Sequence, residues 1–295
     1  MTSVGVIAHQ GKSFGGGLGE LLQLLTDRGF PDTKWYEIAK SKGAPAAARK
    51  ALGDGVDLVL IWGGDGTAQR CLDVLAGSKV TVALLPAGTA NLLAGNLGVP
   101  SGLEEALDVA LNGTRRRIDV GVVNGERFAI MAGAGLDALT MKEADGPMKD
   151  HFGRLAYVWT GAKATQPRAP KVSVTVDGKK WFKGRASCVL FGNMGSLGVG
   201  LTAFPEASPS DGILEVGVVT AQGAVQWARV LSRLAVGRPQ RSKFVRMTRG
   251  RKVKVKFSRP IAYELDGGAR PPTRRVKVRV EPGAVSVCVP EPSAR

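Results

Sequence analysis

The stretch that most constrains the fold of this chain is a short apolar run that stops at a cluster of glycines. Residues 58–62 suit a buried strand, and Gly63-Gly64-Asp65-Gly66-Thr67 follow directly. Glycine permits backbone turns that a Cβ atom would obstruct. Apolar residues return at helical spacing from Ala68 to Leu75, which predicts that the loop opens a helix. A strand, a glycine loop and a helix in this order can present backbone amides to phosphate.

Two side chains of this loop suit phosphoryl transfer. Thr67 can add a hydroxyl to the phosphate contacts, and Asp65 can hold Mg²⁺ or accept a proton from an attacking alcohol. The alternative interpretation is an ordinary strand-to-helix turn in which Asp65 caps the helix. The motif alone leaves both interpretations open.

A second strand ends in the same way. The apolar residues from Val80 to Leu85 are followed by Pro86-Ala87-Gly88-Thr89-Ala90-Asn91, and Leu92-Leu93-Ala94 begin a helix. Open α/β sheets bind ligands at the carboxyl ends of their strands. The two glycine turns are therefore expected to face one crevice.

Length and composition limit the other possibilities. A chain of 295 residues that is 44% hydrophobic favours two domains. Two histidines are too few for a multi-histidine metal site, and the three cysteines lie far apart in apolar runs, which indicates reduced core thiols. No apolar run approaches the length of a membrane span, and the first residues lack the features of a signal peptide. We expect a soluble, cytoplasmic protein.

The pattern of hydrophobic residues changes near Arg117. Short alternating segments, among them 118–123, 127–131, 172–176 and 252–257, predict a mainly antiparallel β domain. We therefore expect an α/β domain over residues 1–117 and a β-rich domain over residues 118–295, whose C-terminal strand can pack back on the first domain. Apolar residues over much of a helix expected at 152–163 favour a core position, with the wall of a lipid cleft as the alternative.

Gly63 to Thr67, followed about twenty residues later by Pro86 to Ala94, resembles the diacylglycerol kinase catalytic family, which includes bacterial lipid kinases and sphingosine kinases. NAD kinases share a similar glycine–aspartate loop, but the second motif is closer to the lipid kinases. The resemblance implies an α/β ATP-binding domain, a sandwich-like lipid-substrate domain and an active site in the cleft between them. It also implies the ATP contacts, which are Gly63, Gly64, Asp65, Gly66, Thr67, Gly88, Thr89 and Asn91.

Two further segments gain a role from this resemblance. The segment Gly135-Leu136-Asp137-Ala138 is similar to one that lies near the acceptor head group in the lipid kinases, which gives that role to Asp137. Asp211, with the carbonyl groups of Ser208 and Ile213, would hold a structural Mg²⁺. In both segments an ordinary turn carboxylate is the alternative.

The late Asp-Gly-Glu motif of the family is altered here to Asp266-Gly267-Gly268. Because the missing glutamate is associated with catalysis in the family, two possibilities stay open. One is an ATP- and Mg²⁺-dependent kinase that phosphorylates a hydroxyl of diacylglycerol or a related sphingoid or ceramide-like lipid in phospholipid biosynthesis, with Asp65 and Asp266 as catalytic carboxylates. The other is a nucleotide- or lipid-binding protein that kept the fold.

The net charge of +16 predicts an anionic partner. Ten lysines or arginines and no acidic residue lie between Arg238 and Arg259. An anionic membrane surface, nucleic acid or nucleotide phosphates would suit this stretch, and a solvated strand face is the simple alternative. Only Phe244 and Phe257 interleave with the charge, which disfavours nucleic acid. We expect peripheral contact with a membrane; the sequence is compatible with a homodimer.

Overall fold

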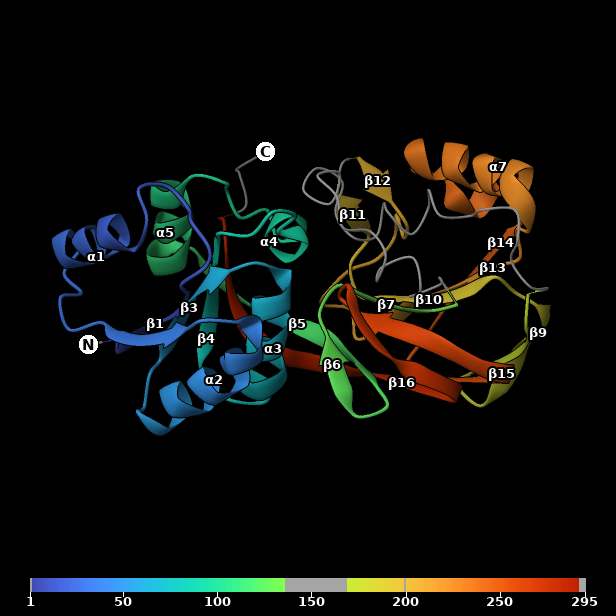
Figure 1. Cartoon of the computed structure of the whole chain (residues 1–295), viewed down its shortest axis with the longest axis horizontal. Coiled ribbons are helices and arrows are strands. Elements are labelled where there is room, and N and C mark those ends of the chain that lie inside the picture. Colours follow the sequence, from blue (N-terminus) through green and yellow to red (C-terminus); the bar gives the residue numbers. More distant parts are fainter. Residues whose placement is uncertain (1, 136–168, 199, 292–295) are drawn as a thin grey trace. The chain divides into compact units, whose positions relative to one another are not determined.

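The computed structural model describes residues 2–135, 169–198 and 200–291. The chain forms two compact units, Met1–Ile118 with Gly283–Arg295, and Asp119–Pro282 (Figure 1). Two long strands, β5 (Thr114–Val123) and β16 (Gly268–Val289), contribute residues to both units. Asp137 and the helix expected at 152–163 lie outside the described residues, so both stay predictions.

The first unit is built on a parallel sheet with the strand order β16-β4-β3-β1-β2. The pairs Ser286–Thr81 and Val287–Val82 join the end of β16 to β4 in parallel. Figure 1 shows α1 and α5 on one face of this sheet and α2 and α3 on the other. The elements are β1 (Val4–His9), α1 (Leu18–Asp27), β2 (Lys34–Ile38), η1 (Ser41–Gly43), α2 (Ala44–Gly53), β3 (Leu58–Gly63), α3 (Asp65–Leu75), β4 (Thr81–Pro86), α4 (Leu92–Asn96) and α5 (Leu103–Asn112).

The central strands of this sheet have the composition that their position requires. Every residue of β3 and of β4 is buried, because helices cover both faces of the sheet. These strands therefore read as continuous apolar runs, and each stops where the glycine loops begin. The α/β prediction for this part of the chain is confirmed.

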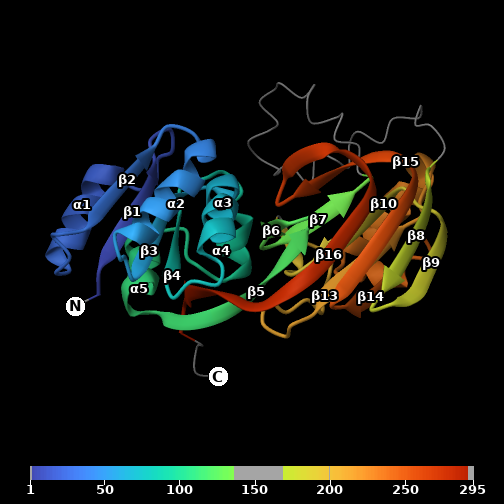
Figure 2. The same cartoon turned by 90° about the horizontal axis from the view of Figure 1, so that it is seen from below.

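The second unit is an antiparallel sandwich, as predicted, with the strand path β14-β13-β10-β7-β15-β16. Strand β8 lies between β15 and β9 and pairs with both (Figure 2). The remaining elements are β6 (Glu126–Phe128), β7 (Met131–Ala134), β8 (Lys171–Val176), β9 (Lys179–Arg185), β10 (Cys188–Gly192), β11 (Ser196–Gly198), β12 (Leu201–Thr202), β13 (Leu214–Val219), α7 (Gly223–Ala235), η4 (Pro239–Arg241), β14 (Val245–Gly250) and β15 (Lys252–Leu265).

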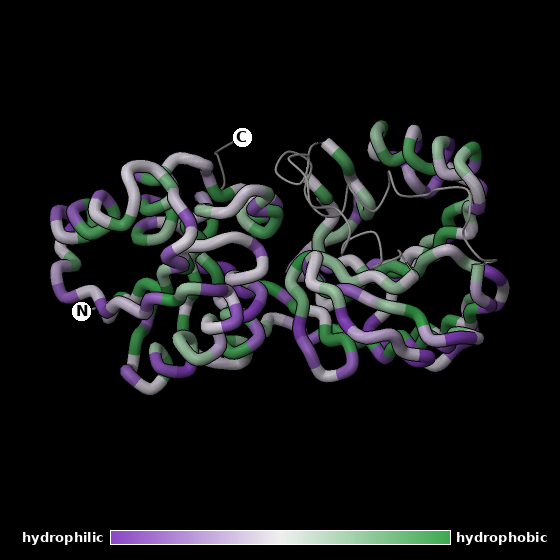
Figure 3. Tube along the Cα trace, viewed as in Figure 1, coloured by the Kyte–Doolittle hydropathy of each residue, from purple (hydrophilic) through white to green (hydrophobic). Residues whose placement is uncertain are grey.

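The sandwich of the second unit has two different outer faces. Valines of β10, β13 and β15 point into the shared core. On one outer side, Cys188 and Val219 pack with Val230 and Leu234 of α7, so this helix covers the sheet there. Hydrophobic and hydrophilic residues alternate along the coil of α7 in Figure 3. On the opposite outer side, the lysines of β15 alternate with the core valines and are exposed.

One strand prediction was wrong in detail. The stretch 127–131, expected as one strand, is divided between β6 and β7. The amides of the intervening residues donate to the side chain of Asp266 instead of continuing a ladder. The three cysteines are free and buried, as expected of core thiols.

Candidate functional site

The two glycine loops of the first unit lie in direct contact. A Cβ atom added to Gly88 would lie 2.4 Å from the Cα of Gly64, and one added to Gly64 would lie 3.1 Å from the Cα of Gly88. Any side chain at Gly88 would therefore push the loops apart. Glycine is needed at this point so that the ends of β3 and β4 can form one surface.

Asn91 shapes the second loop from within. Its backbone is left-handed, with φ 45°, a conformation that asparagine tolerates better than most residues. Its side-chain Oδ1 accepts the N–H of Gly88 at 2.9 Å, and its Nδ2 donates to the carbonyl groups of Pro86 at 2.8 Å and Gly88 at 2.7 Å. These bonds fix the turn. The predicted contact of Asn91 with ATP stays a prediction.

Asp65 ties the first loop to the second. It is the first residue of α3, and its Oδ1 accepts the N–H of Leu93 in α4 at 2.9 Å. Burial raises the pKa of Asp65 above its ordinary value, while the amides of Leu93 and Leu92 act in the opposite direction. A carboxylate with a raised pKa is a better proton acceptor once it is ionised, which suits the role of general base.

The two residues that follow Asp65 in the motif differ in accessibility. Gly66 is exposed at the second position of α3, and a Cβ atom there would have no neighbour within 4 Å among the described residues. Thr67 is only 1% exposed, and its Oγ1 lies 3.0 Å from the Oγ of Ser41. Gly66 and the exposed Thr89 thus offer open surface to a ligand, whereas the hydroxyl of Thr67 already has a partner. Sequence reasoning missed Ser41, which lies in a short 3₁₀ turn with no motif of its own.

The loop geometry favours an anion at this surface. Helix α3 spans eleven residues, and its positive N-terminal end coincides with the glycine motif. Gly64 is the N-cap residue and no side chain caps the helix. Backbone amides and the helix dipole together make such an end suitable for phosphate groups.

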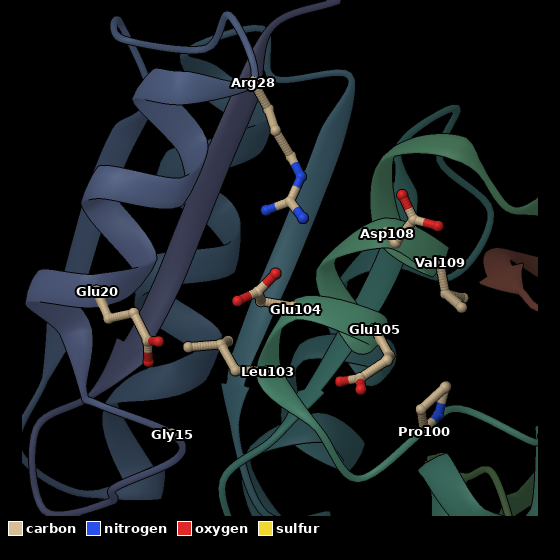
Figure 4. Close-up of a pocket in the computed structure, with 9 residues that line it drawn as sticks. All are labelled: Gly15, Glu20, Arg28, Pro100, Leu103, Glu104, Glu105, Asp108 and Val109. Carbon is tan, nitrogen blue, oxygen red and sulfur yellow. The ribbon is translucent and has the colours of Figure 1, made fainter.

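A pocket elsewhere in the first unit has the opposite character. It has a volume of about 790 Å³ and lies between α1 and α5 (Figure 4). Its charged lining consists of Arg28 and four carboxylates, which are Glu20, Glu104, Glu105 and Asp108. Four carboxylates against one guanidinium group would repel the phosphates of a nucleotide. The presence of a large pocket alone therefore does not identify the phosphate site.

In the second unit, Asp266 stabilises the local backbone through its side chain. It sits at the β15–β16 turn with φ 44°, and its carboxylate accepts three backbone N–H groups, from Ala129 at 2.7 Å, Ile130 at 2.9 Å and Met131 at 2.9 Å. These bonds hold the start of β7. Beside it, a Cβ atom on Gly268 would lie 2.8 Å from Nη1 of Arg270. The catalytic role of Asp266 stays a prediction.

The side chain expected to hold a structural Mg²⁺, that of Asp211, makes other contacts in this structure. Asp211 Oδ1 accepts the N–H of Ile213 at 3.0 Å, and Oδ2 lies 2.8 Å from Nη2 of Arg249. The same arginine contacts Glu215 through Nε at 2.8 Å. Within the described residues there is no group of three or more His, Cys, Asp or Glu placed to hold a metal ion. A guanidinium group thus neutralises Asp211. The metal role of Asp211, Ser208 and Ile213 stays a prediction.

Taken together, these features define a two-domain protein in which an α/β domain with two contacting glycine loops precedes an antiparallel sandwich. The sequence model of the "Diacylglycerol kinase catalytic domain" matches residues 9–123, and that of the "YegS C-terminal NAD kinase beta sandwich-like domain" matches residues 130–289. The chain therefore belongs to the diacylglycerol kinase and YegS-like family, which confirms the resemblance.

Individual relatives agree with this placement. The chain is 29% identical to the diacylglycerol kinase of Bacillus subtilis, over 85% of this chain and 83% of that protein. It is 32% identical to "Probable lipid kinase YegS-like" of Pseudomonas aeruginosa, over 82% of this chain and 79% of that protein.

Solved structures share the fold. A diacylglycerol kinase from Bacillus anthracis matches with a TM-score of 0.79 at 22% identity, covering 98% of this chain and 97% of that one. An NAD kinase from Archaeoglobus fulgidus in complex with ATP matches with a TM-score of 0.57 at 12% identity, covering 99% and 94%. Among the described residues, no helix is long and apolar enough to cross a membrane.

Proposed function

We propose that this protein is a lipid kinase that transfers the γ-phosphate of ATP to a hydroxyl of diacylglycerol or a related sphingoid or ceramide-like lipid. The observation that carries the proposal is the joined pair of glycine loops, in which Gly64 packs on Gly88 and Asp65 binds the amide of Leu93. The relatives named as diacylglycerol kinase and lipid kinase supply the class of acceptor. The sequence motifs expected of such an enzyme thus lie on two loops that contact each other at the start of α3, which supports a phosphate site there.

In this proposal the glycine loops bind the phosphates and Asp65 receives the proton of the lipid hydroxyl. The exposed backbone at Gly66 lets an oxygen of the phosphate approach the start of α3, where the helix dipole favours negative charge. Phosphoryl transfer needs little deprotonation before the new bond forms, so one well-placed carboxylate can suffice. Mg²⁺ enters as the counter-ion of ATP. Asp266 would act indirectly, by holding the amides of residues 129–131.

A non-catalytic binding protein is the second candidate, and Gly268 is the observation that favours it. The family glutamate is absent at this position, and a side chain added there would approach Arg270, whose Nε is held by Glu126 at 2.7 Å. A side chain at this position would therefore require the guanidinium group of Arg270 to shift. A protein that lost the catalytic carboxylate could still bind ATP or a lipid through the remaining residues.

The test is turnover of labelled ATP against a total lipid extract, with the product identified by mass spectrometry. The proposal expects a phosphorylated lipid in the wild type and strongly reduced product in Asp65→Asn. Saturable ATP binding without product on any lipid would favour the binding protein. Equal product from the wild type and Asp65→Asn would refute the role of Asp65.

We further propose that the protein is cytoplasmic and works at the membrane that holds its lipid, in phospholipid biosynthesis. The net charge of +16 supports attraction to an anionic bilayer. Binding to anionic vesicles but not to neutral ones is the expected result of a sedimentation assay.

A further inference from the structure

Helix α7 and the segment after it form an unusual surface of the second unit. The chain carries no Asp or Glu from Val216 to Tyr263, and five cations lie between Arg229 and Lys243. The inner side of α7 is used for packing, because Val230 and Leu234 are buried against the sheet. Several residues on the outer side of α7 are exposed.

The outer side of α7 carries an exposed valine near each of its ends. Val225 is 68% exposed and Val236 at the helix end is 60% exposed. The positions between them on the same helical stripe are Ala228 and Ser232, both exposed. In the described residues only one other large hydrophobic side chain, Leu22 of α1, is exposed to a comparable degree. An exposed valine at each end of one helix is not explained by packing.

Cations border this stripe. Arg229 and Arg233 are exposed one turn apart on α7, and Arg238, Arg241 and Lys243 follow the helix. A helix with apolar residues along one line and arginines beside them is suited to lie in the interface of a bilayer, with valines among the acyl chains and guanidinium groups at the phosphates. Nucleic acid would use the charges but would leave the valines in water.

Packing behind the helix adds a second observation. A small apolar void of about 40 Å³ lies between α7 and the sheet, and its lining includes Cys188, Trp227 and Val230. Its walls are almost wholly apolar side chains, so opening α7 toward a bilayer would expose a surface that acyl chains can wet. The interfacial helix and an apolar interior are therefore adjacent.

We propose that the outer side of α7, from Val225 to Val236, together with the basic segment to Lys243, is the surface that seats this protein on an anionic lipid bilayer. The inference rests on the proposed function to the extent that a lipid acceptor resides in a bilayer. It replaces the broader expectation that the whole stretch from Arg238 to Arg259 contacts the membrane.

The lysines of β15, which belong to that stretch, lie on the other outer face of the sandwich. Lys254 stands opposite Lys277, and Lys256 opposite Arg275, in the antiparallel pair of β15 and β16. Like charges in direct cross-strand pairs destabilise a sheet slightly, but this face has no exposed apolar side chain of the size found on α7 among the described residues. It can be attracted to anions but has nothing to insert. Because α7 packs on the opposite side of the core, both faces cannot seat on one flat bilayer.

The test is flotation of the full chain with vesicles of phosphatidylcholine and phosphatidylglycerol, compared with phosphatidylcholine alone. Wild type should float with the anionic vesicles. Arg229→Gln with Arg233→Gln should weaken binding on the order of tenfold or more, because each near-surface cation contributes separately. Val225→Asn with Val236→Asn should weaken it to a similar order on the same vesicles.

Matched control variants separate the effect of position on the surface from the effect of losing a charge or an apolar side chain. Lys254→Gln with Lys256→Gln removes the same charge from the opposite face, where screening over about one Debye length should limit the change to about twofold. Leu22→Asn removes the exposed leucine of the first unit and should leave flotation unchanged. Thermal unfolding of each variant confirms that it is folded.

The outcomes distinguish this inference from the proposed function. Turnover on a short-chain diacylglycerol dispersed in detergent should be unchanged in all four variants. If the wild type floats normally but shows no turnover, the kinase proposal is refuted and the membrane proposal stands. The role of α7 would be overturned if the lysine pair and the arginine pair lost vesicle binding equally, or if the variant without both valines floated fully. It would also be overturned if double-stranded DNA bound α7 and displaced the vesicles.

Discussion

Alanine at Gly66 should separate the effect of a ligand from the effect of the fold. The exposed glycine occupies the second position of α3, and its added Cβ atom would meet no atom within 4 Å in the part of the chain that the structure describes. Alanine is the better helix former, so the free energy of unfolding should stay level or rise by up to about 1 kcal/mol. The same methyl group would occupy the surface that the phosphates are proposed to use.

The expected loss of ATP affinity follows from the bonds at that surface. A hydrogen bond between an amide and a charged phosphate oxygen contributes about 1.5–3 kcal/mol, so losing one should weaken binding on the order of tenfold to a hundredfold. Titration calorimetry with ATP and Mg²⁺ measures this change, and thermal denaturation measures the stability. Valine at Gly64 would test less, because a side chain there crowds Gly88.

The matched control is Gly19→Ala. Gly19 is also exposed at the second position of a helix, α1, with nothing within 4 Å of an added Cβ atom. It should show a similar change of stability and no change of ATP affinity. Unaltered ATP affinity in Gly66→Ala, or an equal loss in the control, would refute the assignment of the phosphate surface.

Three further changes test other residues. Asp65→Asn keeps an oxygen for the Leu93 amide, so ATP should still bind while turnover falls about a hundredfold or more; turnover at the wild-type rate would contradict this. Arg249→Met leaves buried Glu215 without its cation and should lower the free energy of unfolding, measured in urea, by about 1–3 kcal/mol; an unchanged value would contradict this. Tyr36 has a pKa raised to about 12 from 10.0 by burial and its bond to Asp54, so the unfolded chain loses this proton first as the pH rises. The free energy of unfolding should therefore decline by about 1.4 kcal/mol per pH unit between about pH 10 and pH 12. Urea titrations measure this slope, which should be absent in Tyr36→Phe.

The elements of the first unit could be predicted because their signals are local. Strand β3 extends one residue beyond the expected run 58–62, and β4 is shifted by one residue from the expected run 80–85. Continuous apolar runs that end at glycine mark both the strand and the loop after it. The same local pattern indicated where phosphate should bind.

Partners distant in the sequence could not be predicted in this way. The bond between Thr67 and Ser41 joins residues 26 positions apart, and Asp266 holds amides more than 130 positions before it. No periodic pattern encodes such pairs, although they decide which motif residues face solvent. Helix α7 was missed as well, since Gln222 at its N-cap makes no side-chain capping bond and its first turn lacks an acidic residue.

The pairing of β16 with β4 has a consequence for how the protein is made on the ribosome. The strand that joins the edge of the first sheet, through Ser286 and Val287, is synthesised only after the whole second unit. Until then the buried edge at Thr81 and Val82 has no neighbour on that side, and an open strand edge can pair with another chain. Nascent chains halted before Ser286 should therefore require chaperone protection of the first unit, although nearly all of its sequence has already emerged.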